Sequence, residues 1–592
     1  MTKTAISLLA ALAVTAAMPA ADVQVTDASI VGSTTWTKNN TYILNGLVFV
    51  ENGETLTIEP GTVVKAKPGT GAAASALLVA RGGKIFANGT ASEPVVFTAE
   101  ADNLNGNLGK DDRGLWGGVV LLGRARINTA SGQGNIEGIP TTEVRGIYGG
   151  TDDDDSSGSM RYVSIRHGGS VIGANNELNG LSLGAVGRGT TLEYIEVFAN
   201  ADDGFEFFGG TANAKYLVSA FNDDDGFDWD EGFRGKLQFL FHLQDSAVGN
   251  QALECDGGTT PEDGQPFARP TIYNLTSIGS GAASSNSLSN GPIFRDNTGG
   301  FIFNSIFHDY KGYAFRIETE SAQAEDSAKR LAAGDTRIAN NIFGTFGAGA
   351  GNDQLFIAPN VTSGGPAPAS NYTAAHIAAA AQGNRLNTDP KIRAISRTKN
   401  ATLDPRLAPD SPALTGAAAA PNDGFFTVAP YVGAFSAGAN WAYSWTKLGR
   451  DGYFSAAGNT PASTLLNIST RATIGGSTVA FPGFVIGGDR GQTVLIRAVG
   501  PGLAAFPGVT PAADPVLELY NGANQKIADA DDWSNALFAE VATRVGAFPL
   551  PAGGSKDAVL IANLPPGNYS AIVRAKAGTA GGEVIIEVYT VE

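Results

Sequence analysis

The sequence predicts an all-β protein: a right-handed parallel β-helix followed by a small antiparallel β-sandwich. The composition is one observation, because 77 Gly and 28 Pro among 592 residues favour short strands joined by tight turns. A second is self-similarity, since residues 194–207 align with residues 216–229, one repeat of 22 positions later. The third is a change of pattern after Ser463, where alternating apolar strands replace the repeat.

The overall composition excludes two classes of protein. Hydrophobic residues make up 43% of the chain, so enough apolar surface is available to offset chain entropy, and the chain is not intrinsically disordered. The net charge of −17 would repel a phosphate backbone, which excludes nucleic acid as a partner.

The N-terminus has the organisation of a secretory signal peptide. Lys3 precedes an apolar run from Ala5 to Ala17, and small residues follow. The run is too short to span a bilayer, and no other segment has the length of a transmembrane helix. We therefore predict a signal peptide over residues 1–21 and an exported protein that is extracellular, on the cell surface or periplasmic. Cys255 is the single cysteine, so we expect no intramolecular disulfide.

The repeated unit predicts one coil of a parallel β-helix. It contains two short apolar strands and a turn rich in Asn, Asp and Gly, as at 202–207 (DDGFEF) and again at 224–229 (DDGFDW). Each strand would pair with its equivalent one coil later, and the inward aromatic side chains would stack. An all-β sandwich is the competing interpretation, but the tight repetition with Asp/Asn turns favours the β-helix.

Other segments extend or interrupt this pattern. Strands of the same kind lie at 46–50, 55–64, 77–79, 95–97, 119–121, 162–165, 272–275, 303–306 and 338–342. Residues 321–333 and 371–382 are predicted as short helices inserted on the flank of the β-helix, the second with Asn371 as N-cap. Residues 101–160 are polar and Gly-rich, and we expect an exposed loop there.

The predicted domains follow from these segments. The β-helix covers residues 22–454, and its last part, about 404–454, contains Trp441 and Trp445. We expect that part to cap the C-terminal end, because an open last coil would expose apolar side chains and a strand edge. Residues 455–592 contain alternating strands between Gly, Pro, Asn and Asp turns, which predicts the β-sandwich domain.

Two acidic segments, 202–210 (DDGFEFFGG) and 228–235 (DWDEGFRG), resemble those of a family of bacterial exported right-handed β-helix proteins with a pectin-lyase-like fold. The resemblance covers about residues 30–450 and implies the fold. Members are often attached to the cell surface and mostly lack an assigned activity, so the resemblance implies no reaction. The tail from 463 resembles a sandwich appended to many exported bacterial proteins, which implies a sorting, anchoring or spacer role.

The same acidic segments predict a calcium site. Residues 202–231 hold nine carboxylates and one Lys, and the repeat places equivalent carboxylates in neighbouring coils, about 4.8 Å apart. Opposed like charges repel, and Ca²⁺ with its oxygen ligands would relieve the repulsion. The candidate ligands are Asp202, Asp203, Glu206, Asp223, Asp224, Asp225, Asp228 and Asp230, and of these Asp223, Asp224, Asp225, Asp228 and Asp230 are preferred. Solvated turns explain the same residues without a metal.

Extending the repeat predicts an outward column that runs from carboxylates into arginines. Its members would be Ser182, Glu206, Asp228, Glu254, Arg295 and Arg316. β-Helix polysaccharide lyases combine calcium that neutralises a uronate with an Arg that removes a proton, so the resemblance implies Arg295 and Arg316 as catalytic candidates. The alternative is a charged face whose members neutralise one another.

These observations predict an exported cell-surface or extracellular β-helix protein with a non-catalytic binding or adhesion role, contacting glycans and carrying calcium. The alternative is a calcium-dependent polysaccharide lyase, or another carbohydrate-active enzyme, acting on acidic polysaccharide. An enzyme would need Arg295 or Arg316 within reach of a carboxylate-held cation, in a cleft wide enough for a sugar.

Overall fold

The computed structural model describes residues 21–171, 178–258, 260–457, 467–486, 492–533, 536–551, 554–565 and 567–591. The predicted signal peptide falls outside these residues except for Ala21. The chain divides into two compact units, residues 1–459 and 460–592, and each is described by itself. None of the helices in the described ranges has the length and apolar character needed to cross a membrane.

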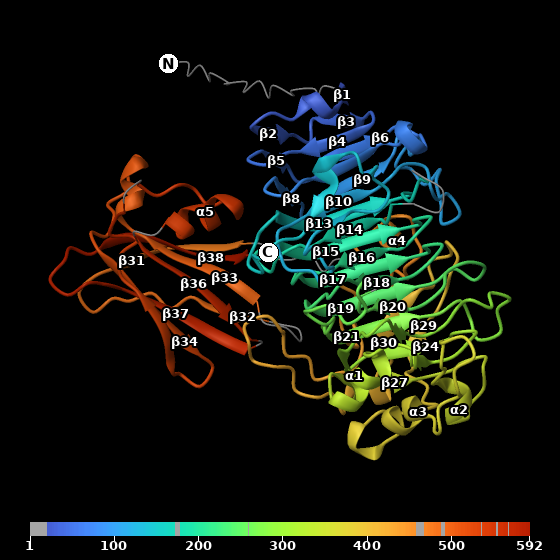
Figure 1. Cartoon of the computed structure of the whole chain (residues 1–592). Helices are drawn as coiled ribbons and strands as arrows, with labels where there is room; N and C mark the ends of the chain where they lie inside the picture. The colour runs from blue at the N-terminus through green and yellow to red at the C-terminus, as the bar shows by residue number, and fades with distance from the viewer. Residues whose placement is uncertain are drawn as a thin grey trace, which may run out of the picture. The chain divides into compact units, whose positions relative to one another are not determined.

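The first unit is a right-handed parallel β-helix, as predicted, and its coils stack in chain order (Figure 1). Sheet I has ten strands: β4 (Leu47–Val50), β7 (Ala76–Val79), β10 (Val119–Leu122), β14 (Leu181–Gly184), β16 (Phe205–Phe208), β18 (Phe227–Asp230), β20 (Leu253–Asp256), β22 (Ile293–Arg295), β25 (Phe315–Ile317) and β28 (Phe356–Ile357). Sheet II has sixteen strands: β1 (Ala21–Val25), β2 (Ser33–Trp36), β3 (Asn40–Leu44), β5 (Thr55–Ile58), β6 (Val63–Ala66), β8 (Lys84–Asn88), β9 (Val95–Ala99), β13 (Gly158–Arg166), β15 (Thr191–Phe198), β17 (Asn213–Ala220), β19 (Lys236–Leu243), β21 (Thr271–Ile278), β23 (Gly300–Phe303), β24 (Ile306–His308), β26 (Thr336–Ala339) and β27 (Ile342–Phe343).

Sheet II bends within each coil, which gives the coil three faces. Strand β13 pairs with β8 on one side of Tyr162 and with β9 on the other, and Tyr162 lies at the bend with φ 48°. Tyr194 and Tyr216 occupy the equivalent positions of β15 and β17 with φ 56° and 59°. A positive φ is unfavourable for a bulky residue. The rings of the three tyrosines stack with centroids 4.3 Å apart, which offsets that cost.

The interior of the β-helix is a stack of apolar side chains. Phe205 lies level with Phe227, and Phe207 lies level with Trp229, in the paired strands β16 and β18. All four side chains are buried, and the ring centroids of Phe205 and Phe227 are 5.3 Å apart. The predicted 22-residue coil and its inward aromatic positions are therefore confirmed. Cys255 of β20 is buried in the same core.

Residues 101–160 are not the exposed loop that we predicted. They contribute β10 to sheet I, and a short hairpin of β11 (Gly134–Asn135) and β12 (Ile147–Tyr148) follows. Ile136, Ile139 and Tyr148 are buried against Leu78 and Val120, which point away from the interior of the β-helix. The segment thus removes an apolar outer surface of sheet I from water.

The C-terminal end of the β-helix is closed by helices, and not by residues 404–454 as predicted. Helix α3 (Tyr372–Ile377) buries Ala374 and Ile377 in the main core. It lies with α1 (Ser327–Ala333) and α2 (Asn352–Leu355) at the end of the stack farthest from β1 (Figure 1). The predicted N-cap is confirmed, because Asn371 Oδ1 accepts a hydrogen bond from Ala374 N at 2.9 Å.

Residues 404–454 lie along the flank of sheet II. After the strands β29 (Ile392–Ala394) and β30 (Asp404–Leu407), the chain passes over the outer side of the tyrosine stack and reaches α4 (Lys447–Arg450). The ring of Trp445 meets Tyr162 and Tyr194 edge-on, at centroid distances of 5.8 and 6.2 Å. The outer surface of sheet II is aromatic here. Residues 404–454 are also rich in aromatic side chains, and they lie on the flank because their rings pack on this surface.

The second unit is an antiparallel β-sandwich, as predicted. One sheet has the order β31 (Asn467–Ile474), β38 (Gly582–Val591), β33 (Gln492–Val499) and β36 (Ala558–Leu564). The other has the order β32 (Gly483–Ile486), β37 (Gly567–Ala575), β34 (Pro515–Asn521) and β35 (Lys526–Ala530). Ile496 and Ile586 of the first sheet share a core with Leu517 and Val573 of the second. Helix α5 (Ala536–Arg544) packs outside β36.

Candidate cation site on an acidic face

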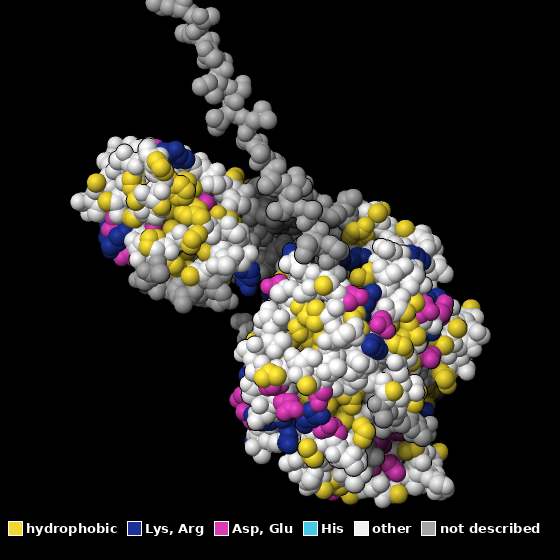
Figure 2. Space-filling view, turned by 90° about the horizontal axis from the view of Figure 1, so that it is seen from above, with side chains coloured by type: hydrophobic (Ala, Val, Ile, Leu, Met, Phe, Trp, Pro, Cys, Tyr) yellow, Lys and Arg dark blue, Asp and Glu magenta, His cyan; other side chains and the backbone are white. Residues whose placement is uncertain are grey.

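The outward side of sheet I carries a column of acidic side chains. Ser182, Glu206, Asp228 and Glu254 are level with one another in β14, β16, β18 and β20, as the repeat predicts. Outward does not mean exposed, however, because Glu206 is only 7% exposed and Asp228 only 8%. On the face of the molecule shown in Figure 2, acidic and basic side chains lie side by side.

The turns that precede these strands form a hydrogen-bonded ladder between coils. Asn179 Oδ1 accepts from Asp203 N at 3.2 Å, and Asp203 Oδ1 accepts from Asp225 N at 2.8 Å. Asp225 Oδ1 accepts from Gln251 N in turn. Each Asp therefore uses one oxygen to satisfy the backbone of the next coil, which gives the repeated Asp a structural reason of its own.

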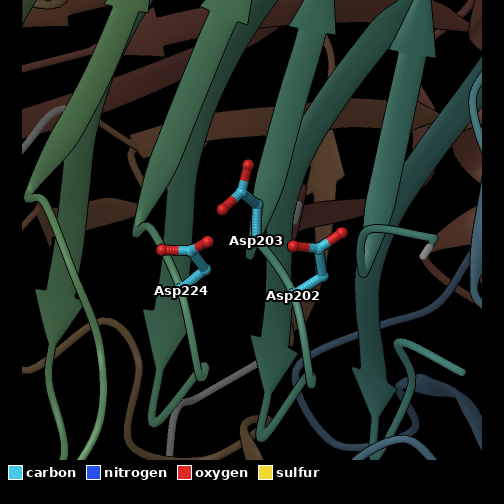
Figure 3. A group of neighbouring side chains, drawn as sticks. All are labelled: Asp202, Asp203 and Asp224. Atoms are coloured by element: carbon cyan, nitrogen blue, oxygen red, sulfur yellow. The ribbon is translucent and has the colours of Figure 1, made fainter. Parts of the chain in front are cut away.

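Carboxylate oxygens of these turns and strands also converge in two groups. One oxygen each from Asp203, Glu206 and Asp228 lie within 4.8 Å of one another, and the same holds for Asp202, Asp203 and Asp224. In Figure 3 the three side chains of the second group come from neighbouring turns, with Asp203 between the two coils. Asp228 Oδ1 is buried without a hydrogen-bond partner. Among the described residues, no Lys or Arg forms an ion pair with Asp203, Glu206 or Asp228.

Three of the eight predicted ligands are not brought into either group. Asp223 is exposed. Asp225 is held by Gln251, and Asp230 Oδ1 accepts from Glu231 N at 2.5 Å. The structure therefore places Asp202, Asp203, Glu206, Asp224 and Asp228 where a cation could reach them, and it places two of the five preferred ligands there.

The electrostatics of the acidic face are unfavourable without a counter-charge. Burial, reinforced by neighbouring carboxylates, raises the pKa of Asp203, Glu206 and Asp228 well above the usual range. Burial also raises the pKa of Glu254 and of Asp256 to about 7, even though Arg295 favours their charged forms. Burial and mutual repulsion therefore favour the binding of protons or of a cation by these carboxylates.

The two arginines lie at the C-terminal end of the acidic column. The predicted position of Arg295 is wrong by two residues, because Arg295 is level with Asp256 while Glu254 is level with Ile293. Arg316 is level with Ile293 and so continues the predicted column. The reason for the shift is the long connection between β20 and β22, which breaks the 22-residue repeat.

Both arginines are already bound by carboxylates. Arg295 donates to Asp256 at 2.6 and 2.9 Å and also pairs with Glu254 at 2.9 Å. Arg316 pairs with Glu318. Although burial works against its charge, these carboxylates raise the pKa of Arg295 above its ordinary value. Arg295 therefore stays charged, which suits a structural ion pair and not a proton acceptor.

Two further side chains belong to the site and were missed in the sequence. Asn179 Nδ2 donates to both Glu137 Oε1, at 2.6 Å, and Glu206 Oε2. Asn179-Gly180-Leu181 aligns with Asp203-Gly204-Phe205, so the repeat contains a signal for Asn179. Glu137 comes from the segment that covers sheet I, and no sequence pattern links it to the coils.

A third acidic group lies in the β-sandwich. Asp514, Asp531 and Asp532 have oxygens within 4.8 Å of one another. Lys576 pairs with Asp531 at 2.5 Å, and Lys556 pairs with Asp532 at 2.6 Å. These lysines already supply counter-charge, so this group differs from the acidic face of the β-helix.

Comparison with known proteins gives one family. A family model described as a pectate-lyase-like β-helix domain matches residues 28–384. A search of curated protein sequences finds no significant match.

Among solved structures, the Acinetobacter phage vB_ApiP_P1 tailspike protein aligns with a TM-score of 0.19 and 11% identity, covering 93% of this chain and 82% of its own. The Dettilon tailspike protein gp208 aligns with a TM-score of 0.19 and 8% identity, covering 94% and 87%. The tailspike protein gp49 of Acinetobacter baumannii bacteriophage Fri1, a capsular polysaccharide depolymerase, aligns with a TM-score of 0.18 and 9% identity, covering 91% and 81%. At TM-scores this low, the alignments support no conclusion about the fold or the function of this chain.

The family model spans more than half of the chain, and it covers the stacked parallel coils and the acidic face described above. The chain therefore belongs to the pectate-lyase-like β-helix family.

Proposed function

We propose that this protein is an exported, non-catalytic binding or adhesion protein whose acidic face holds calcium and whose surface contacts glycans. The observation that carries the metal is the group Asp203, Glu206 and Asp228. Its oxygens converge within 4.8 Å, and Asp228 Oδ1 is buried with no hydrogen-bond partner. A buried, unpartnered carboxylate oxygen is costly unless a cation or a proton satisfies it.

The donor set fits calcium. Ca²⁺ takes six to eight oxygen ligands at about 2.3–2.6 Å. It binds each carboxylate through one or both oxygens, and water completes the shell. The three carboxylates together offer oxygens of the required kind, and none of the three is neutralised by a described Lys or Arg. Asp202 and Asp224 are partly exposed beside Asp203 and would form the entrance.

The alternative, a calcium-dependent lyase on acidic polysaccharide, has weaker support. Its base would be Arg295 or Arg316, and each is engaged by a carboxylate. The raised pKa of Arg295 works against the loss of its proton. An acidic substrate would also have to approach a face with an excess of carboxylates. Membership of the pectate-lyase-like family supports the fold and leaves the reaction open.

A melting experiment on the full chain tests the metal. The melting temperature is measured in calcium, in magnesium at equal ionic strength and in chelator. A ligand that binds only the folded state adds about 2.7 kcal/mol at a hundredfold excess over its Kd, so calcium should raise the melting temperature. Magnesium prefers rigid octahedral, water-rich coordination and should substitute poorly.

Two variants make that experiment specific. Asp228→Asn should remove the difference between calcium and magnesium and should stabilise the chelated protein, since it relieves repulsion. Asp223→Asn is the matched control, because Asp223 lies in the same acidic turn but is exposed and outside both groups. Equal melting temperatures of the unmodified chain in all three solutions would exclude the calcium site.

A second experiment separates binding from catalysis. The protein is incubated with uronate polysaccharides in calcium, and the ultraviolet absorbance of unsaturated products is followed while retention in affinity electrophoresis is measured in parallel. Retention without unsaturated products supports a binding protein. Unsaturated products that disappear in Arg295→Gln would establish the lyase instead.

A further inference from the structure

We propose that a pocket between β9, β13 and the end of α4 binds an oxyanion, of the carboxylate or sulfate type, through Arg166 and Arg450. The pocket belongs to the β-helix unit and has a volume of about 310 Å³. That is at the lower end of the roughly 300–1,000 Å³ typical of small-molecule sites. The proposal is independent of calcium and of the acidic face on sheet I.

Arg166 is a buried guanidinium without an ion-pair partner. The residue is only 5% exposed, and its Nε donates to Ser164 Oγ at 2.8 Å. Among the described residues, no carboxylate lies within ion-pairing distance of Arg166, and its two terminal NH₂ groups donate to no protein acceptor. Glu196 and Asp102 act on the charge of Arg166 through space but form no bond to it, and a buried charge without a direct partner is unfavourable. Arg166 lines the pocket, so its two terminal NH₂ groups can donate to an acceptor that binds inside the pocket.

Arg450 places a second positive charge at the same pocket. Its side chain is oriented by two backbone carbonyls, because Nε donates to Ser444 O at 3.2 Å and Nη2 donates to Ser92 O at 2.8 Å. Neither of these acceptors carries a charge. Partial burial and the charge of Arg166 lower the pKa of Arg450, as expected when two guanidinium groups lie near one another.

The carboxylates around the pocket are engaged elsewhere. Glu93 pairs with Lys38 at 2.7 Å, and Asp451 pairs with Lys447 at 2.8 Å. Glu196, deeper in the same region, accepts hydrogen bonds from Ser164 Oγ at 2.5 Å, from Lys447 N at 2.6 Å and from Leu448 N at 3.2 Å. The protein therefore provides the two arginines with hydrogen-bond acceptors but with no direct counter-ion.

The chemistry of the pocket selects the ligand class. Guanidinium groups present planar pairs of N–H donors that match the oxygens of carboxylate, sulfate and phosphate. Val63, Pro94 and Val96 supply an apolar wall beside them. That combination suits an oxyanion carried on a compact organic group, such as the carboxylate of a uronic acid or a sulfate ester on a sugar.

Calorimetric titration of the full chain tests this site in chelator, so that the calcium site does not contribute. Galacturonate, inorganic sulfate and neutral galactose are titrated separately at constant ionic strength. We expect saturable one-to-one binding of galacturonate or sulfate and none of galactose. Tighter binding of galacturonate would identify a sugar carboxylate, and tighter binding of sulfate would identify a sulfate group.

Variants of Arg450 locate the binding. Arg450→Gln keeps a side chain that can donate to the two carbonyls and removes the charge, and it should weaken binding about tenfold or more, the loss expected for a charge-assisted hydrogen bond. Arg393→Ala is the matched control, since Arg393 is also exposed, lies on the same flank and donates to the carbonyls of Leu407 and Ala437. Absence of saturable binding, equal binding of galactose, or unchanged binding in Arg450→Gln would overturn the proposal.

Discussion

Aspartates in similar sequence contexts meet different partners in this chain. Asp203 satisfies a backbone N–H of the next coil, whereas Asp228 leaves one buried oxygen without a partner. Asp153, in the segment 101–160 that we expected to be an exposed loop, pairs with Arg126 at 2.8 Å and with Arg234 at 3.2 Å. Only the partner decides whether an aspartate stabilises a turn, forms an ion pair or provides a metal ligand.

The core positions of the coil give the first prediction. Phe227 is fully buried between coils, so Phe227→Ala should reduce the free energy of unfolding of the β-helix by about 3–5 kcal/mol, as for other buried aromatic residues. Val428→Ala is the control and should change it by less than about 0.5 kcal/mol, because Val428 is 84% exposed. Denaturant unfolding measures both. A loss below about 1 kcal/mol for Phe227→Ala would contradict the packing.

At the scale of elements, one buried carboxylate binds residues 404–454, the flank segment, to the β-helix. Glu196 lies on β15, and its oxygens accept the first two N–H groups of α4, 251 and 252 positions away in the chain. The aromatic contacts of Trp445 with the tyrosine stack lie beside it. The flank segment is thus held by packing and by a hydrogen-bonded anion at the start of a helix.

Glu196→Gln tests this fastening. A neutral amide keeps one acceptor oxygen and loses the charge-assisted bonds, so the free energy of unfolding should fall by about 1–3 kcal/mol. Limited proteolysis should then cut residues 404–454 faster, while the coils stay resistant. Glu193→Gln is the control, since Glu193 on the same strand is partly exposed and pairs with Arg161. Unchanged proteolysis of the flank in Glu196→Gln would show that the aromatic packing suffices.

The elements that could be predicted are those with local repetition. Strands β16 and β18 repeat after 22 residues, which was enough to derive the inward aromatics and the acidic column. Arg295 was misplaced because a long connection interrupts the repeat before β22. Glu137 and the flank segment reach their partners through long-range packing, and a single sequence contains no periodic signal for such contacts.

At the scale of the whole molecule, the buried acidic face makes stability depend on pH. The pKa of Glu254 and of Asp256 is about 7 in the folded state, against about 4 in an unfolded chain. Between these values the folded state holds protons that the unfolded state has released, so stability falls as pH rises. Carboxylates with a lowered pKa, such as Asp153, act only below about pH 4.

Calorimetry in chelator between pH 5 and pH 7 checks this prediction. We expect the melting temperature of the β-helix to fall as the pH rises, and calcium to reduce the fall if the cation replaces the protons. Glu254→Gln should flatten the dependence, because an amide cannot ionise. A melting temperature that is constant or rises over this range would contradict the prediction.

The β-sandwich is stabilised by contacts within its own unit, and this gives the last prediction. The β-sandwich has its own apolar core, and the buried Arg497 pairs with Glu587 of the same unit at 2.5 Å. Asp557 accepts from Gly500 N at 2.7 Å and from Gly502 N at 3.0 Å, which also lies within the unit. Its buried polar groups therefore do not depend on the β-helix for these partners.

A fragment from about Ala457 to Glu592 should accordingly be soluble and fold by itself. Urea should unfold it in one cooperative transition with an m-value of about 1–3 kcal/mol/M, as for other small domains. Arg497→Met is informative in the fragment, because it leaves Glu587 buried without its partner and should destabilise the fold by about 3–5 kcal/mol. A fragment that is unfolded, while the rest of the chain remains stable, would mean that the sandwich requires the β-helix and that the boundary near residue 457 is wrong.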